Sequence, residues 1–278
     1  MWEEVVKGCM DFSYEVEDPA THEKKTIRTG VHPWCYELFN EPSCWDESPY
    51  AKQCFAEKMK ARYGSIEKLN RAWAASEAGA RQFESFEALA TAYGDAKNPT
   101  AFLVEYTKFI ETCFASLLEE GAAIVAKTDR GALATFQPCM TRTRGLDLYR
   151  CYKPLGVVCS RTNGGGSLDA HLLRALADGK PIVDNEMYIG QTFGSIRGAY
   201  LAQYQRGFNI SYSFKWDGRK SAYNFMNPDN VAADALLAVR ASKREILDVN
   251  AFFTPRNRGL YLWRWQNPHP EKSIAAID

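Results

Sequence analysis

The chain has 278 residues, of which 46% are hydrophobic and 13% aromatic, enough for a sizeable core and too apolar for a disordered segment. Its 34 basic side chains balance its 34 acidic ones, so the composition excludes an electrostatic footprint for nucleic acid or an anionic membrane. No run approaches 18 apolar residues, and the first residues lack the basic and apolar regions of a signal peptide. We therefore expect a cytoplasmic protein, provided that no segment precedes Met1.

The first half of the chain is predicted to be mainly helical, with one buried strand. Hydrophobic residues recur at helical spacing through 100–127, the longest predicted helix. Ser65 is placed to cap the helix that follows it. In chain order we expect a helix at 3–13, a polar loop at 18–25, a buried strand at 31–40, and helices at 49–62, 65–73 and 100–127.

Short strands alternate with helices in the second half. We expect strands at 132–138, 155–160, 181–186 and 208–216, and helices at 168–177, 195–206 and 230–249. This alternation is typical of parallel βα units, in either a doubly wound sheet or a (β/α)8 barrel. The glycines at 164–166 follow a strand but lack the phosphate-loop pattern common in doubly wound folds. We therefore favour an α/β fold of the (β/α)8 TIM-barrel type.

Two carboxylates stand where predicted strands end. The strand at 31–40 stops at Asn40-Glu41-Pro42, and the strand at 181–186 stops at Glu186. A barrel gathers the carboxyl ends of its strands on one rim, so residues far apart in sequence can meet there. Retaining glycosidases place two carboxyl groups about 5–5.5 Å apart, one as proton donor and one as nucleophile. Glu41 and Glu186 are therefore candidate catalytic residues, and the Asn40 amide is placed to bind a sugar hydroxyl.

Simpler interpretations of these residues stay open. Glu41 on its own can be a solvated carboxylate, and regular alternation would point Asp184 to the same face as Glu186. The position at the strand end favours Glu186 as the catalytic residue. We expect Glu37 to belong to a buried ion pair, and we include Tyr188 as a candidate substrate-binding residue.

The eight cysteines are scattered without a CxxC pair, which favours reduced thiols. Cys35, Cys44 and Cys54 lie near Glu41 in the sequence, but their spacings of nine and ten residues do not match common zinc-ligand patterns. We therefore predict neither a metal site nor a cofactor.

Three stretches carry a family resemblance: YGSIEKLNRAW at Tyr63–Trp73, FESFEAL at Phe83–Leu89 and KPIVDNE at Lys180–Glu186. They are similar to sequences of glycoside hydrolase family 42 β-galactosidases. An Asn-Glu pair ending strand 4 and a Glu ending strand 7 also resemble the wider clan of retaining (β/α)8 glycosidases.

The resemblance implies a retaining β-galactosidase with Glu41 as the acid/base and Glu186 as the nucleophile. It further implies that Trp216, at the end of the last strand, stacks on the sugar. Many family members carry closely spaced cysteines that bind zinc, a pattern that Cys44 and Cys54 do not reproduce.

The resemblance also implies that the chain is part of a longer enzyme. Only about thirty residues precede the strand that would be strand 4, whereas three βα units need roughly 90 residues. We expect a partial barrel (strands 4 to 8) over 1–252 and the beginning of a following domain over 253–278. Two alternatives stay open: another clan member, such as a β-mannanase or β-glucosidase, or a non-catalytic carbohydrate-binding fragment. The expected partner is a carbohydrate substrate, and homo-oligomer formation is left open.

Overall fold

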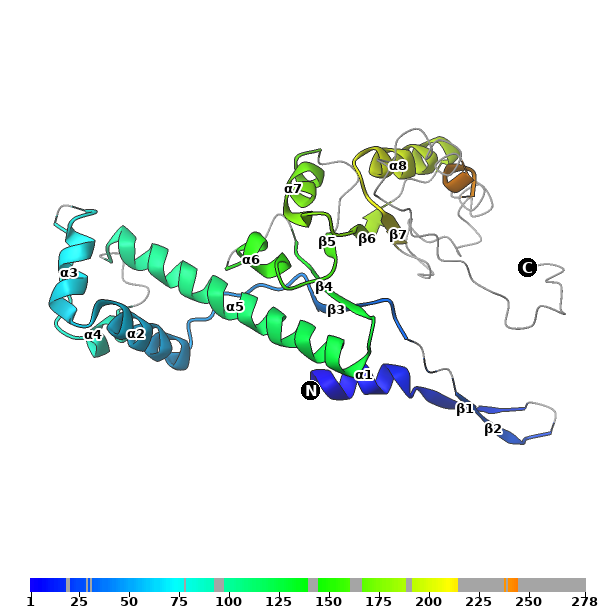
Figure 1. Cartoon of the computed structure of the whole chain (residues 1–278), viewed down its shortest axis with the longest axis horizontal. Helices are drawn as coiled ribbons and strands as arrows, with labels where there is room; N and C mark the ends of the chain where they lie inside the picture. The colour runs from blue at the N-terminus through cyan, green and yellow to red at the C-terminus, as the bar shows by residue number, and fades with distance from the viewer. Residues whose placement is uncertain are drawn as a thin grey trace.

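The computed structural model describes residues 1–18, 21–28, 30, 32–77, 79–92, 98–139, 145–160, 167–188, 192–214, 238 and 240–244, with only the backbone at 167–169, 188, 213 and 214. The described residues form an elongated molecule with a group of helices at one end and a β-hairpin at the other (Figure 1). The predicted helix at 230–249 is described only at 238 and 240–244, which are helical. Trp216 and the expected domain boundary after residue 252 lie outside the described residues.

The N-terminal region is a helix followed by a β-hairpin. Helix α1 (Trp2–Met10) is shorter than the predicted 3–13, and strands β1 (Ser13–Glu17) and β2 (Lys24–Arg28) pair antiparallel. The polar loop expected at 18–25 is thus a turn that already includes the start of β2. Strand β2 could not be recognised from this polar sequence, because both hairpin strands are largely exposed and carry few core residues.

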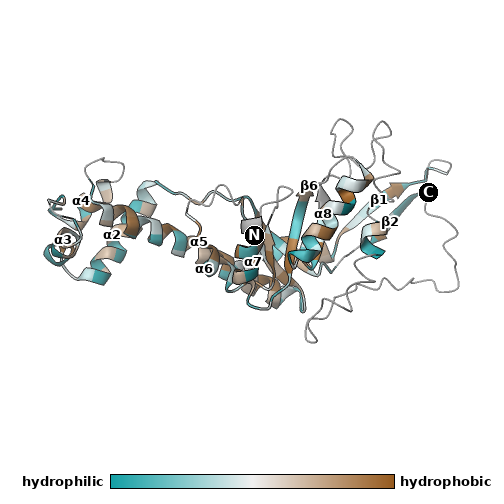
Figure 2. Ribbon diagram, turned by 90° about the horizontal axis from the view of Figure 1, so that it is seen from above, coloured by the Kyte–Doolittle hydropathy of each residue, from teal (hydrophilic) through white to brown (hydrophobic). Residues whose placement is uncertain are grey.

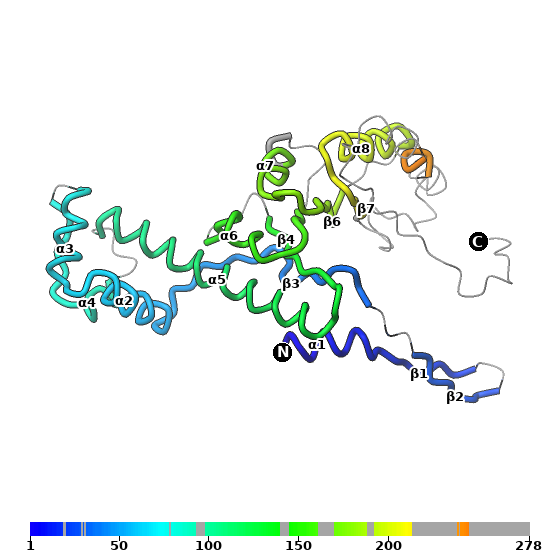
Figure 3. The backbone as a smooth tube through the Cα atoms, viewed as in Figure 1, coloured from blue at the N-terminus to red at the C-terminus, as the bar shows by residue number. Residues whose placement is uncertain are grey.

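Among the described residues, four helices separate the first parallel strand from the second. They are α2 (Pro49–Tyr63), α3 (Ile66–Ala74), α4 (Phe86–Thr91) and α5 (Thr100–Thr128). Residues 49–110 form a helical insert with its own core, and α5 runs from this insert past β3 (Cys35–Asn40) to α1 (Figure 3). The predicted helices at 49–62, 65–73 and 100–127 are confirmed within one or two residues, whereas the short α4 was not predicted.

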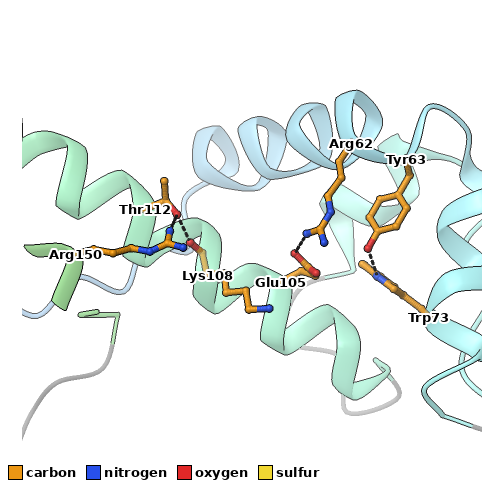
Figure 4. A network of polar contacts seen from close by, with 7 residues as sticks. All are labelled: Arg62, Tyr63, Trp73, Glu105, Lys108, Thr112 and Arg150. Atoms are coloured by element: carbon orange, nitrogen blue, oxygen red, sulfur yellow. Dashed lines mark hydrogen bonds and ion pairs between the residues drawn. The ribbon is translucent and has the colours of Figure 1, made fainter. Parts of the chain in front are cut away.

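The motif Tyr63–Trp73 has a structural role in this insert. Ser65 caps α3 by accepting a hydrogen bond from the Lys68 backbone N–H, as expected. The Asn70 side chain is buried and both donates to the Phe83 carbonyl (2.8 Å) and accepts from the Phe83 N–H (2.9 Å). Figure 4 shows Tyr63 and Trp73 joined by a hydrogen bond beside the ion pair that links α2 to α5. The motif therefore closes the insert around its aromatic core.

The rest of the described chain alternates strands with helices, as predicted. The strands are β3, β4 (Leu133–Gln137), β5 (Val158–Ser160), β6 (Ile182–Tyr188) and β7 (Ile210–Phe214); the helices are α6 (Leu148–Tyr152), α7 (Ser167–Ala177) and α8 (Phe193–Gln205). Of these helices, α6 was not predicted. Strand β3 pairs with β4, and β6 pairs with both β5 and β7, in each case parallel. The Gly156 N–H donates to the Ala134 carbonyl (3.1 Å), so β4 and β5 are also neighbours.

The described strands form small sheets with no closed barrel among them. Their outer surface packs on helices: Leu38 and Phe136 belong to a core that includes Phe114 and Leu118 of α5. The inner surface has a second apolar cluster to which all five parallel strands or their immediate flanks contribute: Cys35, Leu133, Val157, Cys159, Val183 and Ile210. The five strands therefore pack against one another through this cluster and against helices through the first core.

The helices around these strands carry both hydrophobic and hydrophilic residues along their length (Figure 2). Among the described residues no helix is long and apolar enough to cross a membrane.

Candidate active site at the carboxyl ends of the parallel strands

Glu41 lies immediately after β3, at the carboxyl end of the strand. Its backbone N–H donates to the carbonyl oxygen of Gln137, the last residue of β4, over 2.7 Å. The backbone of Glu41 has a φ of 46°, in the left-handed region that residues other than glycine, asparagine and aspartate seldom adopt. Such conformations persist where the surrounding structure enforces them, and they cluster at functional sites. Here the hydrogen bond to Gln137 and the following Pro42 fix the turn.

A β-bulge precedes this turn. Glu37 is opposite Thr135 and Asn40 is opposite Gln137, so β3 has one more residue than β4 over the same length. An extra residue bends the strand and redirects the side chains after it. Regular alternation therefore does not determine the direction of Glu41, and Asn40 lies exposed at the strand end.

A second bulge occurs in β6. Asp184 is opposite Ser211 and Met187 is opposite Ser213, so the extra residue falls at 185–186. Asp184 is fully buried and its carboxylate accepts a 2.8 Å hydrogen bond from the Gln203 amide of α8. Glu186 turns instead toward β4. The two carboxylates thus have different amide partners, although Asp184 also accepts a hydrogen bond from the Glu186 backbone N–H (3.3 Å), and the shared face that regular alternation would give them is wrong.

Glu186 meets β4 at the side-chain amide of Gln137. The Gln137 Nε2 atom donates to Glu186 Oε2 over 2.7 Å, and only 2% of Gln137 is exposed. The same residue accepts the Glu41 backbone N–H through its carbonyl. Glu41, which follows β3, and Glu186, which lies two residues before the end of β6, are therefore connected through one residue of β4. The prediction that the strand stops at Glu186 is wrong, because β6 continues to Tyr188.

Gln137 and Asn185 were not identified from the sequence. Gln137 ends a predicted strand and is followed by Pro138, just as Glu41 is followed by Pro42. The sequence therefore contained a signal for Gln137. Asn185 lies inside the motif assigned to Glu186, but its partner is Glu37 of β3, whose carboxylate accepts a hydrogen bond from the Asn185 amide. That pairing depends on the order of strands in space.

Glu37 adds a third carboxylate below the strand ends. Although much of the side chain is exposed, desolvation of its carboxyl group raises the pKa. The Asn185 hydrogen bond opposes this by lowering the pKa, and the charge of Glu186 raises it further. Among the described residues Glu37 has this amide partner in place of the buried ion pair expected from the sequence.

The remaining candidate residues lie apart or outside the described part. Tyr188 ends β6, but its side chain is outside the described residues, as is all of Trp216. Cys35 packs in the inner cluster, Cys44 against the outer core and Cys54 against the core of the helical insert, so the structure does not bring these three thiols together. No group of three potential metal ligands occurs among the described residues.

No protein-family model matches the chain, and no curated protein matches it in sequence. Solved structures share its fold. The β-galactosidase from the psychrophilic Marinomonas ef1 matches with a TM-score of 0.67 and 13% identity, over 92% of this chain and 43% of that one. The β-galactosidase from the Antarctic haloarchaeon Halorubrum lacusprofundi matches with a TM-score of 0.61 and 18% identity, over 87% and 40% of the two chains. An exo-β-agarase matches with a TM-score of 0.55 and 16% identity, over 71% and 30%.

These similarities establish a mixed α/β fold like that of the solved β-galactosidase and agarase structures. The chain spans less than half the length of the two β-galactosidase chains. At these identities the likeness assigns no chemistry to individual residues.

Proposed function

We propose that this chain is part of a retaining glycoside hydrolase that acts on β-linked galactosides, with Glu41 as the acid/base and Glu186 as the nucleophile. The observation that carries the proposal is that Gln137 accepts a hydrogen bond from the backbone N–H of Glu41 and donates one to the carboxylate of Glu186, so the two residues lie beside the same residue of β4. A double displacement requires two carboxyl groups near one another. The sugar class is supported by the structural likeness to β-galactosidases.

The proposed scaffold is a partial (β/α)8 barrel over 1–252, holding strands 4 to 8, with 253–278 beginning a following domain. Five parallel strands in chain order and an inner apolar cluster drawn from all of them support this architecture. In such a barrel the catalytic groups come from the carboxyl ends of the strands. Glu41 directly follows β3, and Glu186 lies two residues before the end of β6, which supports this assignment.

The reaction proceeds in two displacements. Glu186 attacks the anomeric carbon while protonated Glu41 donates to the leaving oxygen, so a glycosyl ester forms and an alcohol departs. Ionised Glu41 then removes a proton from water, whose oxygen attacks the anomeric carbon and releases Glu186. Each displacement inverts the configuration, and the product retains that of the substrate. Asn40 is placed to bind the sugar 2-hydroxyl, and Trp216 and Tyr188 are proposed to contact the sugar.

Hydrolysis of a chromogenic β-galactoside tests the proposal. We would measure turnover by this chain and by a version extended at its N-terminus with three further βα units, using β-mannoside and β-glucoside as comparison substrates. The expected result is β-galactoside hydrolysis by the extended version. Glu41→Ala should lower the rate by about 10²–10⁴-fold, as for loss of a general acid, and Glu186→Ala should abolish it.

Azide distinguishes the two carboxylates by stereochemistry. In Glu186→Ala a single attack by azide on a β-galactoside should give the α-galactosyl azide, whereas Glu41→Ala should give the β-galactosyl azide after two displacements. The anomeric configuration is read from the proton coupling constant of the product. Full activity in Glu186→Ala, or the opposite pair of products, would contradict the assignment.

A further inference from the structure

We propose that Gln137 is a positioning residue that sets the orientation of the Glu186 carboxylate through its side chain and the turn at Glu41 through its backbone. This inference rests on the proposed function and names a residue on which both carboxylates depend. Gln137 contacts neither the sugar nor the scissile bond in this role.

The geometry separates the two contacts of Gln137. Its carbonyl oxygen accepts the Glu41 N–H, a bond that any residue at this position can make, whereas its Nε2 atom donates to Glu186, a bond that only a donor side chain can make. Gln137 is 2% exposed, so the amide has little freedom to leave its place. A change of the side chain should therefore affect Glu186 and leave the turn at Glu41 intact.

Each of the three consecutive polar side chains of β6, at 184–186, takes part in a hydrogen bond between an amide and a carboxylate. Gln203 of α8 donates to Asp184, Asn185 itself donates to Glu37 of β3, and Gln137 of β4 donates to Glu186. The other two amides are thus engaged with other carboxylates. The bulge at 185–186 turns Glu186 out of the regular strand pattern, and the Gln137 amide holds its carboxylate from the neighbouring strand β4.

The test removes the amide and keeps the volume. In Gln137→Met the labelling of Glu186 by a 2-deoxy-2-fluoro-β-galactoside with an activated leaving group should slow by about 10²-fold, the scale expected for a misplacement near 1 Å. Labelling is followed by peptide mass spectrometry, in the polypeptide that hydrolyses the chromogenic β-galactoside. The affinity for galactose as a competitive ligand should stay unchanged, because the amide acts on Glu186 alone. Gln137→Glu, of the same size, should slow labelling as well because it replaces the donor by an acceptor.

Gln203→Met is the matched control. It also removes a buried amide that donates to a carboxylate of β6, but on Asp184, so its urea unfolding midpoint should fall as in Gln137→Met while the labelling rate of Glu186 stays at the wild-type value. Equal labelling rates in Gln137→Met and wild type would overturn the inference. If wild type itself is not labelled at Glu186, the proposed function fails instead.

A crystal structure of this chain with Gln137→Met decides the inference without any activity. The expected result is a displaced Glu186 carboxylate and an unchanged hydrogen bond from the Glu41 N–H to residue 137. An unmoved Glu186 carboxylate would show that Gln137 does not position it.

Discussion

Glu37 is the residue at the candidate site whose surroundings most clearly oppose its charge. Its carboxyl group is desolvated and lies within the field of Glu186, and both effects raise its pKa, while one hydrogen bond from Asn185 lowers it. A carboxyl group with a raised folded-state pKa stabilises the fold below its unfolded pKa, near 4.3, and this contribution is lost as the pH rises through the folded pKa.

Replacement of Glu37 by an uncharged isostere should therefore stabilise the protein at neutral pH. We expect Glu37→Gln to unfold at a higher urea concentration than wild type at pH 7, because the cost of the partly desolvated negative charge beside Glu186 is removed. The difference should shrink toward zero near pH 4, where the wild-type carboxyl group is protonated. Urea titrations followed by tryptophan fluorescence at several pH values measure this, and a difference that grows toward low pH would contradict it.

At the scale of elements, the crossing of α5 over β3 determines how the helical insert is joined to the strands. Gly121 lies in the middle of α5 where Leu38 of β3 approaches, and a Cβ atom added there would be 2.8 Å from Leu38 Cδ1. The approaching atom is the end of the Leu38 side chain, which is buried in the outer core, so an added methyl group requires Leu38 to shift within packed surroundings. The glycine is thus required by close packing and not by helix formation, which it weakens.

Two glycine-to-alanine changes separate these effects. In Gly198→Ala of α8 the new Cβ meets nothing within 4 Å, so stability should rise by up to about 1 kcal/mol from helix propensity. In Gly121→Ala the same gain is opposed by overpacking of about 1–3 kcal/mol, so the net effect should be destabilising. Free energies of unfolding in urea measure both, and a stabilised Gly121→Ala would show that α5 can move away from β3.

At the scale of the whole molecule, the parallel strands of the described residues have two edge strands, β3 and β7. Among the described residues β3 pairs only with β4 and β7 pairs only with β6, whereas β6 pairs on both sides. The Trp34 indole nevertheless donates to the Tyr212 hydroxyl of β7 over 3.2 Å, so the two ends of the set approach across its inner side. A barrel completed by three further strands would occupy the space between these edges.

Amide hydrogen exchange tests this arrangement. In a version extended at the N-terminus by three βα units, exchange should slow at β3 and β7, because their outer amides acquire strand partners. Exchange at β6 should change little, since β6 already has a partner on each side. Unchanged exchange at β3 and β7 in a folded extended version would contradict the partial-barrel proposal.

Some features of this protein follow from the sequence alone. Helices α2, α3 and α5, the parallel strands and the position of Glu41 after a strand could be predicted, because each depends on local periodicity, on a cap such as Ser65 or on a proline. The hairpin strands β1 and β2 and the short helices α4 and α6 were missed, since short or exposed elements carry too little periodic signal.

Only the tertiary structure decided which polar groups meet. Regular alternation assigns Asp184 and Glu186 to one face, but the bulge in β6 separates them, and a bulge exists only in relation to a neighbouring strand. The contact between Gln137 and Glu186 likewise depends on which strands lie side by side, a choice made by the packing of α5 and the inner apolar cluster. Local chemistry thus determined that Glu41 follows a strand and that Glu186 lies in one, and long-range packing determined how the two are connected.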